Sequence, residues 1–85
     1  MTDVTDNAAA SRFELTENGH LAYADYRRDT GRLIIDYVFS PPELRGQGTA
    51  GRLMAGLAAS AAAQGETIVP VCGYAAAWLR RNPQA

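Results

Sequence analysis

The stretch SPPELRGQGTA, residues 40–50, decides the fold, because it joins a predicted strand to a predicted helix. Its two prolines end the strand, since proline cannot donate a hydrogen bond to a neighbouring strand. Gly46 and Gly48 allow the main chain to curl with its N–H groups pointing inward. The alanine-rich helix that follows adds unpaired N–H donors and the positive end of its dipole. This pattern is typical of a turn that binds a pyrophosphate, and Arg45 would add a positive charge.

Three antiparallel strands are predicted before this turn. Residues 12–17 alternate apolar and polar side chains, and residues 20–28 form a second strand with apolar side chains on both faces. The Asn18-Gly19 pair between them is the strongest short hairpin signal. Residues 32–39 are largely apolar on both faces, which is typical of a central strand. The three segments therefore predict a meander. One face of the third strand is predicted to carry Leu33, Ile35, Tyr37 and Phe39.

A helix, a strand and a second helix are predicted after the turn. Apolar residues recur at helical spacing over residues 50–64, and Gly65 is placed to end the helix. Residues 67–71 form a β-branched run after a helix, so we expect a fourth strand parallel to the third. Residues 74–81 form the last helix. The predicted fold is therefore an α/β (α+β) domain with a mostly antiparallel four-stranded sheet and two helices.

Length and composition limit the classes of function. The 85 residues suffice for one domain, which we place at residues 12–85 after a flexible tail at residues 1–11. A net charge of -1 argues against nucleic acid as a partner. The single cysteine, Cys72, and the single histidine, His20, exclude an internal disulfide and a recognisable zinc site. We expect a cytoplasmic location and no membrane association, because the uncharged runs are too short to span a bilayer.

Three segments of the chain carry a resemblance to a known family. RGQGTA, residues 45–50, matches the motif Gln/Arg-x-x-Gly-x-Gly/Ala of the GCN5-related N-acetyltransferase (GNAT) superfamily. Cys72 after the next strand and the ending WLRRNP, residues 78–83, are similar to small single-domain members, sometimes called GCN5-like or YjdJ-type N-acetyltransferases. The similarity covers roughly residues 13–83. It implies a minimal GNAT fold, with the sheet splayed between the third and fourth strands.

The resemblance also implies how a cosubstrate would lie. Main-chain amides of the turn would hold the pyrophosphate of acetyl-coenzyme A (acetyl-CoA), and the pantetheine arm would lie along the end of the third strand. The thioester would then be near Cys72, with its carbonyl polarised by main-chain N–H groups of residues 37–39. No metal is implied. The residues expected to bind the cosubstrate are Val38, Phe39, Arg45, Gly46, Gln47, Gly48, Thr49 and Ala50.

Catalytic residues are indicated less directly than binding residues. Many superfamily members protonate the leaving thiolate with a tyrosine on the last helix, where this chain has Trp78, and small members often carry a histidine where it has Tyr37. Cys72 is either a nucleophile that accepts the acetyl group transiently or a small buried hydrophobe. Tyr37 either orients the amine or belongs to the core. Tyr74 either reaches the thiolate or packs with its hydroxyl at the surface.

We expect an acetyl-CoA-dependent N-acetyltransferase whose acceptor is an unidentified amine, peptide or protein. The alternative is a catalytically weak acyl-CoA-binding sensor or protein-interaction module, because the family's tyrosine is missing. The chain also lacks the helices that build the acceptor pocket of full-length members, so an open acceptor surface is expected. Its oligomeric state is expected to be a monomer or a weak homodimer.

Overall fold

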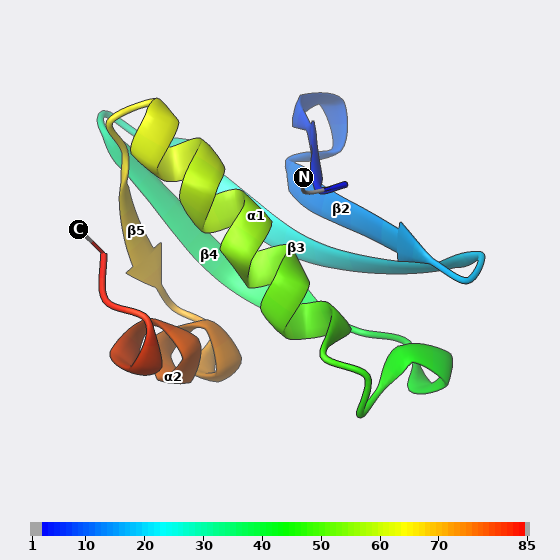
Figure 1. The fold of residues 1–85 in the computed structure, drawn as a ribbon. Helices are drawn as coiled ribbons and strands as arrows, with labels where there is room; N and C mark the ends of the chain where they lie inside the picture. Colours follow the sequence, from blue (N-terminus) through cyan, green and yellow to red (C-terminus); the bar gives the residue numbers. More distant parts are fainter. Residues whose placement is uncertain (1–2, 85) are drawn as a thin grey trace.

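The structure, a computed structural model that describes residues 3–84, has one sheet with two helices packed on the same face (Figure 1). The α+β class predicted from the sequence is confirmed. The five strands lie in chain order across the sheet: β1 (Thr5–Asn7), β2 (Arg12–Glu17), β3 (His20–Asp29), β4 (Arg32–Phe39) and β5 (Thr67–Pro70). The helices are α1 (Thr49–Ala63) and α2 (Gly73–Arg81), and the 3-10 turns are η1 (Ala8–Ala10) and η2 (Pro42–Leu44).

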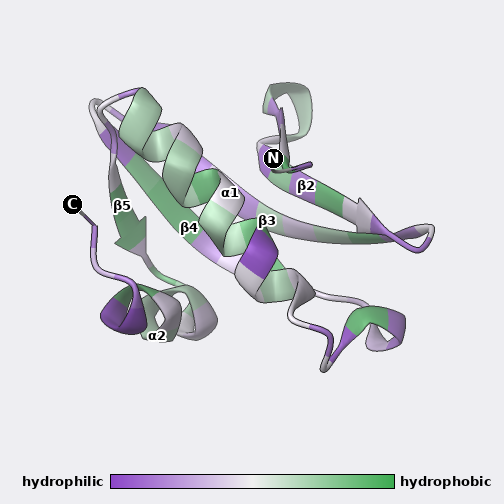
Figure 2. Ribbon diagram, in the orientation of Figure 1, coloured by the Kyte–Doolittle hydropathy of each residue, from purple (hydrophilic) through white to green (hydrophobic). Residues whose placement is uncertain are grey.

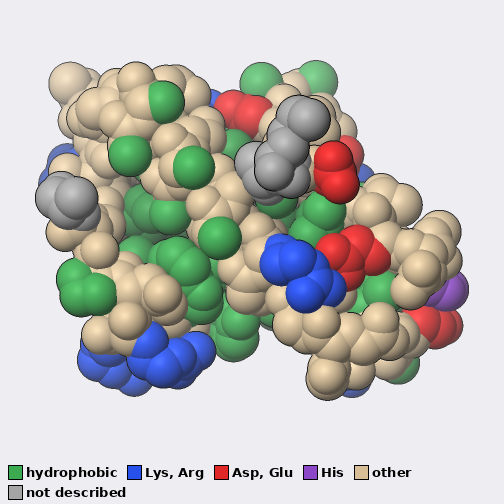
Figure 3. Space-filling view, in the orientation of Figure 1, with side chains coloured by type: hydrophobic (Ala, Val, Ile, Leu, Met, Phe, Trp, Pro, Cys, Tyr) green, Lys and Arg blue, Asp and Glu red, His purple; other side chains and the backbone are tan. Residues whose placement is uncertain are grey.

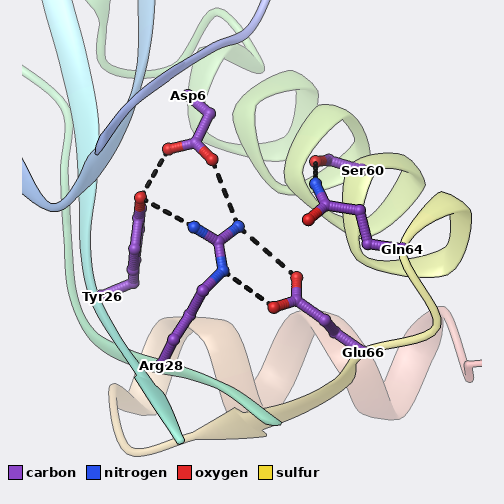
Figure 4. Close-up of polar contacts among 6 residues, drawn as sticks. All are labelled: Asp6, Tyr26, Arg28, Ser60, Gln64 and Glu66. Atoms are coloured by element: carbon purple, nitrogen blue, oxygen red, sulfur yellow. Dashed lines mark hydrogen bonds and ion pairs between the residues drawn. The ribbon is translucent and has the colours of Figure 1, made fainter. Parts of the chain in front are cut away.

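The sheet has one strand more than predicted, because β1 pairs antiparallel with β2. A flexible tail was expected over residues 1–11, and the structure instead places β1 and η1 within it, while residues 1 and 2 lie outside the described residues. Asp6 of β1 accepts hydrogen bonds from the Tyr26 hydroxyl (2.5 Å) and from Arg28 (3.2 Å) (Figure 4). A strand of three residues is too short for its sequence to show the alternation that predicts a strand. The side-chain contacts of β1 with β3 fix its position instead.

The hairpin turn and the parallel strand pair follow the predictions. Asn18 and Gly19 have φ of 51° and 76°, as a turn with two positive φ values requires. β4 lies between β3 and β5, and it pairs antiparallel with the first and parallel with the second. The central position of β4 is therefore confirmed.

The core lies between α1 and the sheet face that it covers. Figure 2 shows hydrophobic residues along α1 and along the strands beneath it. Ala22 and Ala24 are fully buried on β3, and such small side chains let the helix approach the sheet closely. Ala75 of α2 belongs to the same cluster, so both helices share one core. Its larger members are Phe13, Leu15, Leu33, Ile35, Leu53, Met54 and Leu57.

A β-bulge in β4 changes which side chains share a face. Tyr26 pairs with Ile35 and Asp25 pairs with Tyr37, so Asp36 is an extra residue between two paired positions. Beyond the bulge, Tyr37 lies on the face turned away from the helices. The prediction that it shares a face with Leu33 and Ile35 is wrong, because alternation holds only where no residue is inserted.

β4 and β5 separate soon after they pair. The pairing covers four residues of each strand and ends at Ile35, whose carbonyl accepts hydrogen bonds from the N–H groups of Val71 and Cys72, both at 3.0 Å. The chain then turns into α2. Among the described residues no strand pairs with residues 36–39 of β4 on the side of β5, so the two strands form a fork with Cys72 at its base.

Candidate functional site

The turn between β4 and α1 is held by a buried anchor and two glycines. Leu44, the last residue of η2, is only 1% exposed and fixes the turn to the body of the protein. Gly46 and Gly48 have φ of 78° and 79°, a region that other residues enter at a cost. Arg45 donates from Nε to the carbonyl of Ser40 at 3.0 Å, which closes the turn.

Most N–H groups of this turn have no acceptor in the part of the chain that the structure describes. Those of Arg45 and Gln47 bond to carbonyls of η2 at 3.3 Å, and the first helical bond of α1 is from Arg52 to Gly48 at 3.0 Å. Such unpaired donors at the positive end of a helix dipole suit a bound anion. Within residues 3–84, the N–H groups left without an acceptor at this turn are those of Gly46, Gly48, Thr49, Ala50 and Gly51.

A charged cluster supports the turn from the β2–β3 hairpin. Glu17 accepts hydrogen bonds from Thr49 Oγ1 (2.6 Å) and from Arg52 Nε and Nη2 (2.8 and 2.7 Å). Arg52 also donates to the carbonyl of Gln47 at 2.9 Å, so the cluster fixes the main chain of the turn. Figure 3 shows these opposite charges in contact beside the start of α1.

The same contacts change the acidity of Glu17. Hydrogen bonds from Arg52, and then from Thr49, lower the pKa of Glu17 from 4.5 to about 2. The carboxylate therefore stays charged and bonded at neutral pH. Reasoning from the sequence missed this cluster, because Glu17 lies 32 residues from Thr49 and 35 from Arg52, and no motif connects them.

A cavity of about 220 Å³ opens between the turn and the first turn of α2. The Ser40 hydroxyl oxygen is buried without a hydrogen-bond partner, which is unusual for a buried polar atom and fits a polar ligand. Gly51 keeps the space open, because a Cβ there would lie 3.8 Å from the Tyr74 hydroxyl and 3.9 Å from Trp78 Nε1. None of the lining side chains is acidic: Ser40, Leu44, Arg45, Gly46, Gly48, Thr49, Ala50, Gly51 and Tyr74.

Comparison with known families bears on this arrangement. A family model described as GCN5-related N-acetyl-transferase matches residues 12–85. The chain belongs to the GCN5-related N-acetyltransferases. Comparison with curated protein sequences gives no match. Membership in this family of acetyl-CoA-using enzymes agrees with a turn that leaves anion-binding donors free. Among the described residues, no helix is both long and apolar enough to cross a membrane, and no three metal-binding side chains come together.

The structure brings together five of the residues predicted to bind the cosubstrate around this cavity, namely Arg45, Gly46, Gly48, Thr49 and Ala50. Gln47 does not line it, because its side chain donates to the carbonyl of Glu43 at 2.8 Å. Val38 packs against the core, and Phe39 stacks on Tyr23 with ring centroids 5.1 Å apart. Neither Val38 nor Phe39 lines the cavity, although the next residue, Ser40, does.

The three candidate catalytic residues lie at three different places. Cys72 is half-buried at the base of the fork and is the residue before α2. Tyr74, two residues later, lines the cavity, and its hydroxyl lies 3.8 Å from where a Cβ on Gly51 would be. Tyr37 is 50% exposed on the opposite face of the sheet and does not line the cavity.

A larger cavity, of about 290 Å³, lies between the C-terminal halves of α1 and α2. Figure 3 shows apolar side chains in the hollow between the two helices. Ala58, Ala62 and Leu79 contribute to its walls. It has neither glycine-turn donors nor a helix N-terminus, so the smaller cavity is the better candidate for a phosphate-containing molecule.

Proposed function

We propose that this GNAT-family protein transfers an acetyl group from acetyl-CoA to an amine. The observation that carries the proposal is the group of N–H donors left without an acceptor at Gly46 and at Gly48 to Gly51, residues that line a cavity with no acidic side chain. These donors, together with the Arg45 guanidinium, would hold the pyrophosphate. The orphaned Ser40 hydroxyl gives one further polar contact for the cosubstrate.

The chemistry would take place where β4 and β5 separate. A neutral amine attacks the thioester carbonyl carbon, a C–N bond forms, the C–S bond breaks, and the coenzyme leaves as a thiolate. N–H groups of β4 near Val38, on the strand edge that β5 leaves without a partner, would stabilise the oxyanion, a contribution of about 3 kcal/mol per donor in other enzymes. Tyr74, which lines the cavity, would donate its proton to the thiolate, and the ammonium formed by the attack would lose its proton to water.

Cys72 allows a second route for the acetyl group. In this route its thiolate attacks the thioester carbonyl carbon, an S-acetyl bond forms, and the coenzyme leaves as a thiolate. The amine then attacks the S-acetyl carbonyl carbon, a C–N bond forms, and the cysteine sulfur leaves as a thiolate. Cys72 lies at the base of the fork, where its main-chain N–H donates to the Ile35 carbonyl, and this position is compatible with the second route. Intact mass spectrometry after mixing with acetyl-CoA separates the two routes. The relay predicts an acetyl adduct that Cys72→Ala abolishes, and an adduct that persists in Cys72→Ala contradicts it.

Release of free coenzyme A thiol tests the function itself. We expect release that depends on both acetyl-CoA and an amine, measured over a panel of small amines, polyamines and N-terminal peptides against a control without acceptor. Binding of acetyl-CoA without amine-dependent release would instead indicate an acyl-CoA-binding module. The absence of both binding and release would refute the proposal.

A further inference from the structure

Three aromatic rings and one carboxylate lie together on the sheet face turned away from α1. Tyr23 on β3 is paired with Phe39 on β4, and Asp25 is paired with Tyr37 in the same two strands. The centroid of the Tyr23 ring is 5.1 Å from that of Phe39 and 6.4 Å from that of Tyr37. We call these four residues the aromatic–acidic patch.

Asp25 is the carboxylate of this face that has no partner. Among the described residues it makes no hydrogen bond and no ion pair, although it is half-buried. Two neighbouring carboxylates are neutralised, since Glu14 of β2 bonds to Arg12 at 2.6 Å and Asp36 of β4 bonds to Arg27 at 2.7 Å. An unpaired, half-buried carboxylate beside aromatic rings is a suitable partner for a cation.

The rings already pack against a cation within the protein. The guanidinium carbon of Arg12 lies 4.8 Å from the centroid of the Tyr23 ring. Tyr37, by contrast, is 50% exposed, and no described cation packs against it. In this patch the Tyr23 ring therefore already contacts a cation, whereas the Tyr37 ring is open to a ligand.

The patch lies next to the fork where transfer is proposed. Tyr37 is two residues beyond Ile35, the last residue of β4 that pairs with β5, and the bulge at Asp36 places its ring on the open face. No described helix covers this face, because α1 and α2 pack on the other one (Figure 1). A molecule on the patch can thus approach the fork from the side opposite the helices.

We propose that the aromatic–acidic patch binds a second, cationic group of the acetyl acceptor. This inference rests on the proposed acetyl transfer. The amine that attacks must be neutral, so the cation that the patch holds is a different group of the same molecule. The acceptor class is therefore an amine that also carries an ammonium or guanidinium group. A diamine, a polyamine and a basic peptide share this chemistry.

Matched acceptors test the proposal by steady-state kinetics. Cadaverine and pentylamine have the same length, and only cadaverine keeps a charge after one amine is neutral. A short arginine peptide with a free N-terminus and its citrulline counterpart form the second pair. We expect KM to be lower for the charged member of a pair. Asp25→Asn should raise KM for that member about threefold to fivefold with little change for its neutral counterpart.

Asp29→Asn is the control variant, because it removes the same charge at a turn, where Asp29 pairs with Arg32 at 2.7 Å. It should leave both KM values unchanged. An equal effect of the two variants would show a general influence of net charge and overturn the proposal. If Asp25→Asn raises KM for the charged member of only one acceptor pair, that pair shows whether the cation belongs to a diamine or to a basic peptide.

A binding measurement separates failure of the patch from failure of acetyl transfer. Tetramethylammonium chloride, with sodium chloride at equal concentration as the control, should shift the ring NMR signals of Tyr37 and Tyr23, and less so in Asp25→Asn. The proposal is overturned if the shifts are absent or if they are equally large in Asp25→Asn. It is also overturned if the ring signals change with protein concentration but not with added tetramethylammonium. Cation binding at the patch without transfer to any amine contradicts the proposed function and leaves the cation site in place.

Discussion

The polar groups near the two ends of α1 differ in whether they have hydrogen-bond partners. Beyond its C-terminal end, Asp6, Tyr26, Arg28 and Glu66 form a network in which every side-chain polar atom has a partner (Figure 4). At its N-terminal end, five main-chain N–H groups and one buried hydroxyl have no partner among residues 3–84. Paired groups hold elements together, whereas free donors beside a cavity are available to a ligand. The difference indicates which end stabilises the fold and which end binds.

The largest effect on acetyl-CoA binding is expected for Gly48→Ala at the N-terminal end of α1, where the N–H donors are free. The φ of 79° makes any Cβ unfavourable, and the new Cβ would lie 3.1 Å from Arg52 Nη1, which must move away from the turn. We expect acetyl-CoA affinity to fall by at least about tenfold in calorimetry.

Gly65→Ala is its matched control. Gly65 has a similar φ of 69°, and a Cβ there meets nothing within 4 Å. Both variants carry the same kind of backbone strain, of about 1 to 2 kcal/mol, but Gly65→Ala should bind acetyl-CoA like the unmodified protein. Equal losses of affinity would mean that strain in the fold, and not the turn, decides binding.

At the C-terminal end of α1, where the polar groups are paired, we expect a substitution to lower stability without weakening acetyl-CoA binding. Arg28→Met leaves Asp6, Tyr26 and Glu66 without their shared donor, and we expect the free energy of unfolding to fall by about 1 to 2 kcal/mol in urea titrations. Arg27→Met on the neighbouring position breaks a more exposed pair with Asp36 and should cost less than about 1 kcal/mol. Weaker acetyl-CoA binding by Arg28→Met would contradict the division between the two ends.

The smallest effect concerns Glu17, a paired group that holds the free donors in place. Its folded pKa of about 2 lies below the ordinary 4.5, so it stabilises the fold above pH 4.5, and this contribution is lost as the pH falls toward 2. Glu17→Gln lacks this dependence. The difference in melting temperature between the two proteins should therefore shrink between pH 4.5 and 2, and a constant difference would show that the contact does not depend on the charge.

The sequence predicted features that local residue chemistry controls. The β2–β3 hairpin follows from Asn18-Gly19, and the start of α1 and the course of the turn follow from its glycines, whose positive φ values the structure shows. The position of β4 in the centre of the sheet follows from two apolar faces. Each of these depends on neighbours in the chain.

Features that depend on distant residues could not be predicted. β1 is fixed by the bond from Tyr26 to Asp6, 20 residues apart, and the support under the turn depends on Glu17, 32 residues from Thr49. The face of Tyr37 depends on one inserted residue, which alternation cannot reveal. The unpaired Ser40 hydroxyl likewise follows from packing and not from a motif.

The most direct test of the central claim is a titration of the protein's backbone amide NMR signals with coenzyme A. If the free donors bind the pyrophosphate, the largest shifts should be those of Gly46 and Gly48 and of Thr49 to Gly51, while the signals of Arg28 and Glu66 stay unchanged. Shifts confined to the paired end or to the larger cavity between α1 and α2, or no shifts at high ligand concentration, would contradict the claim.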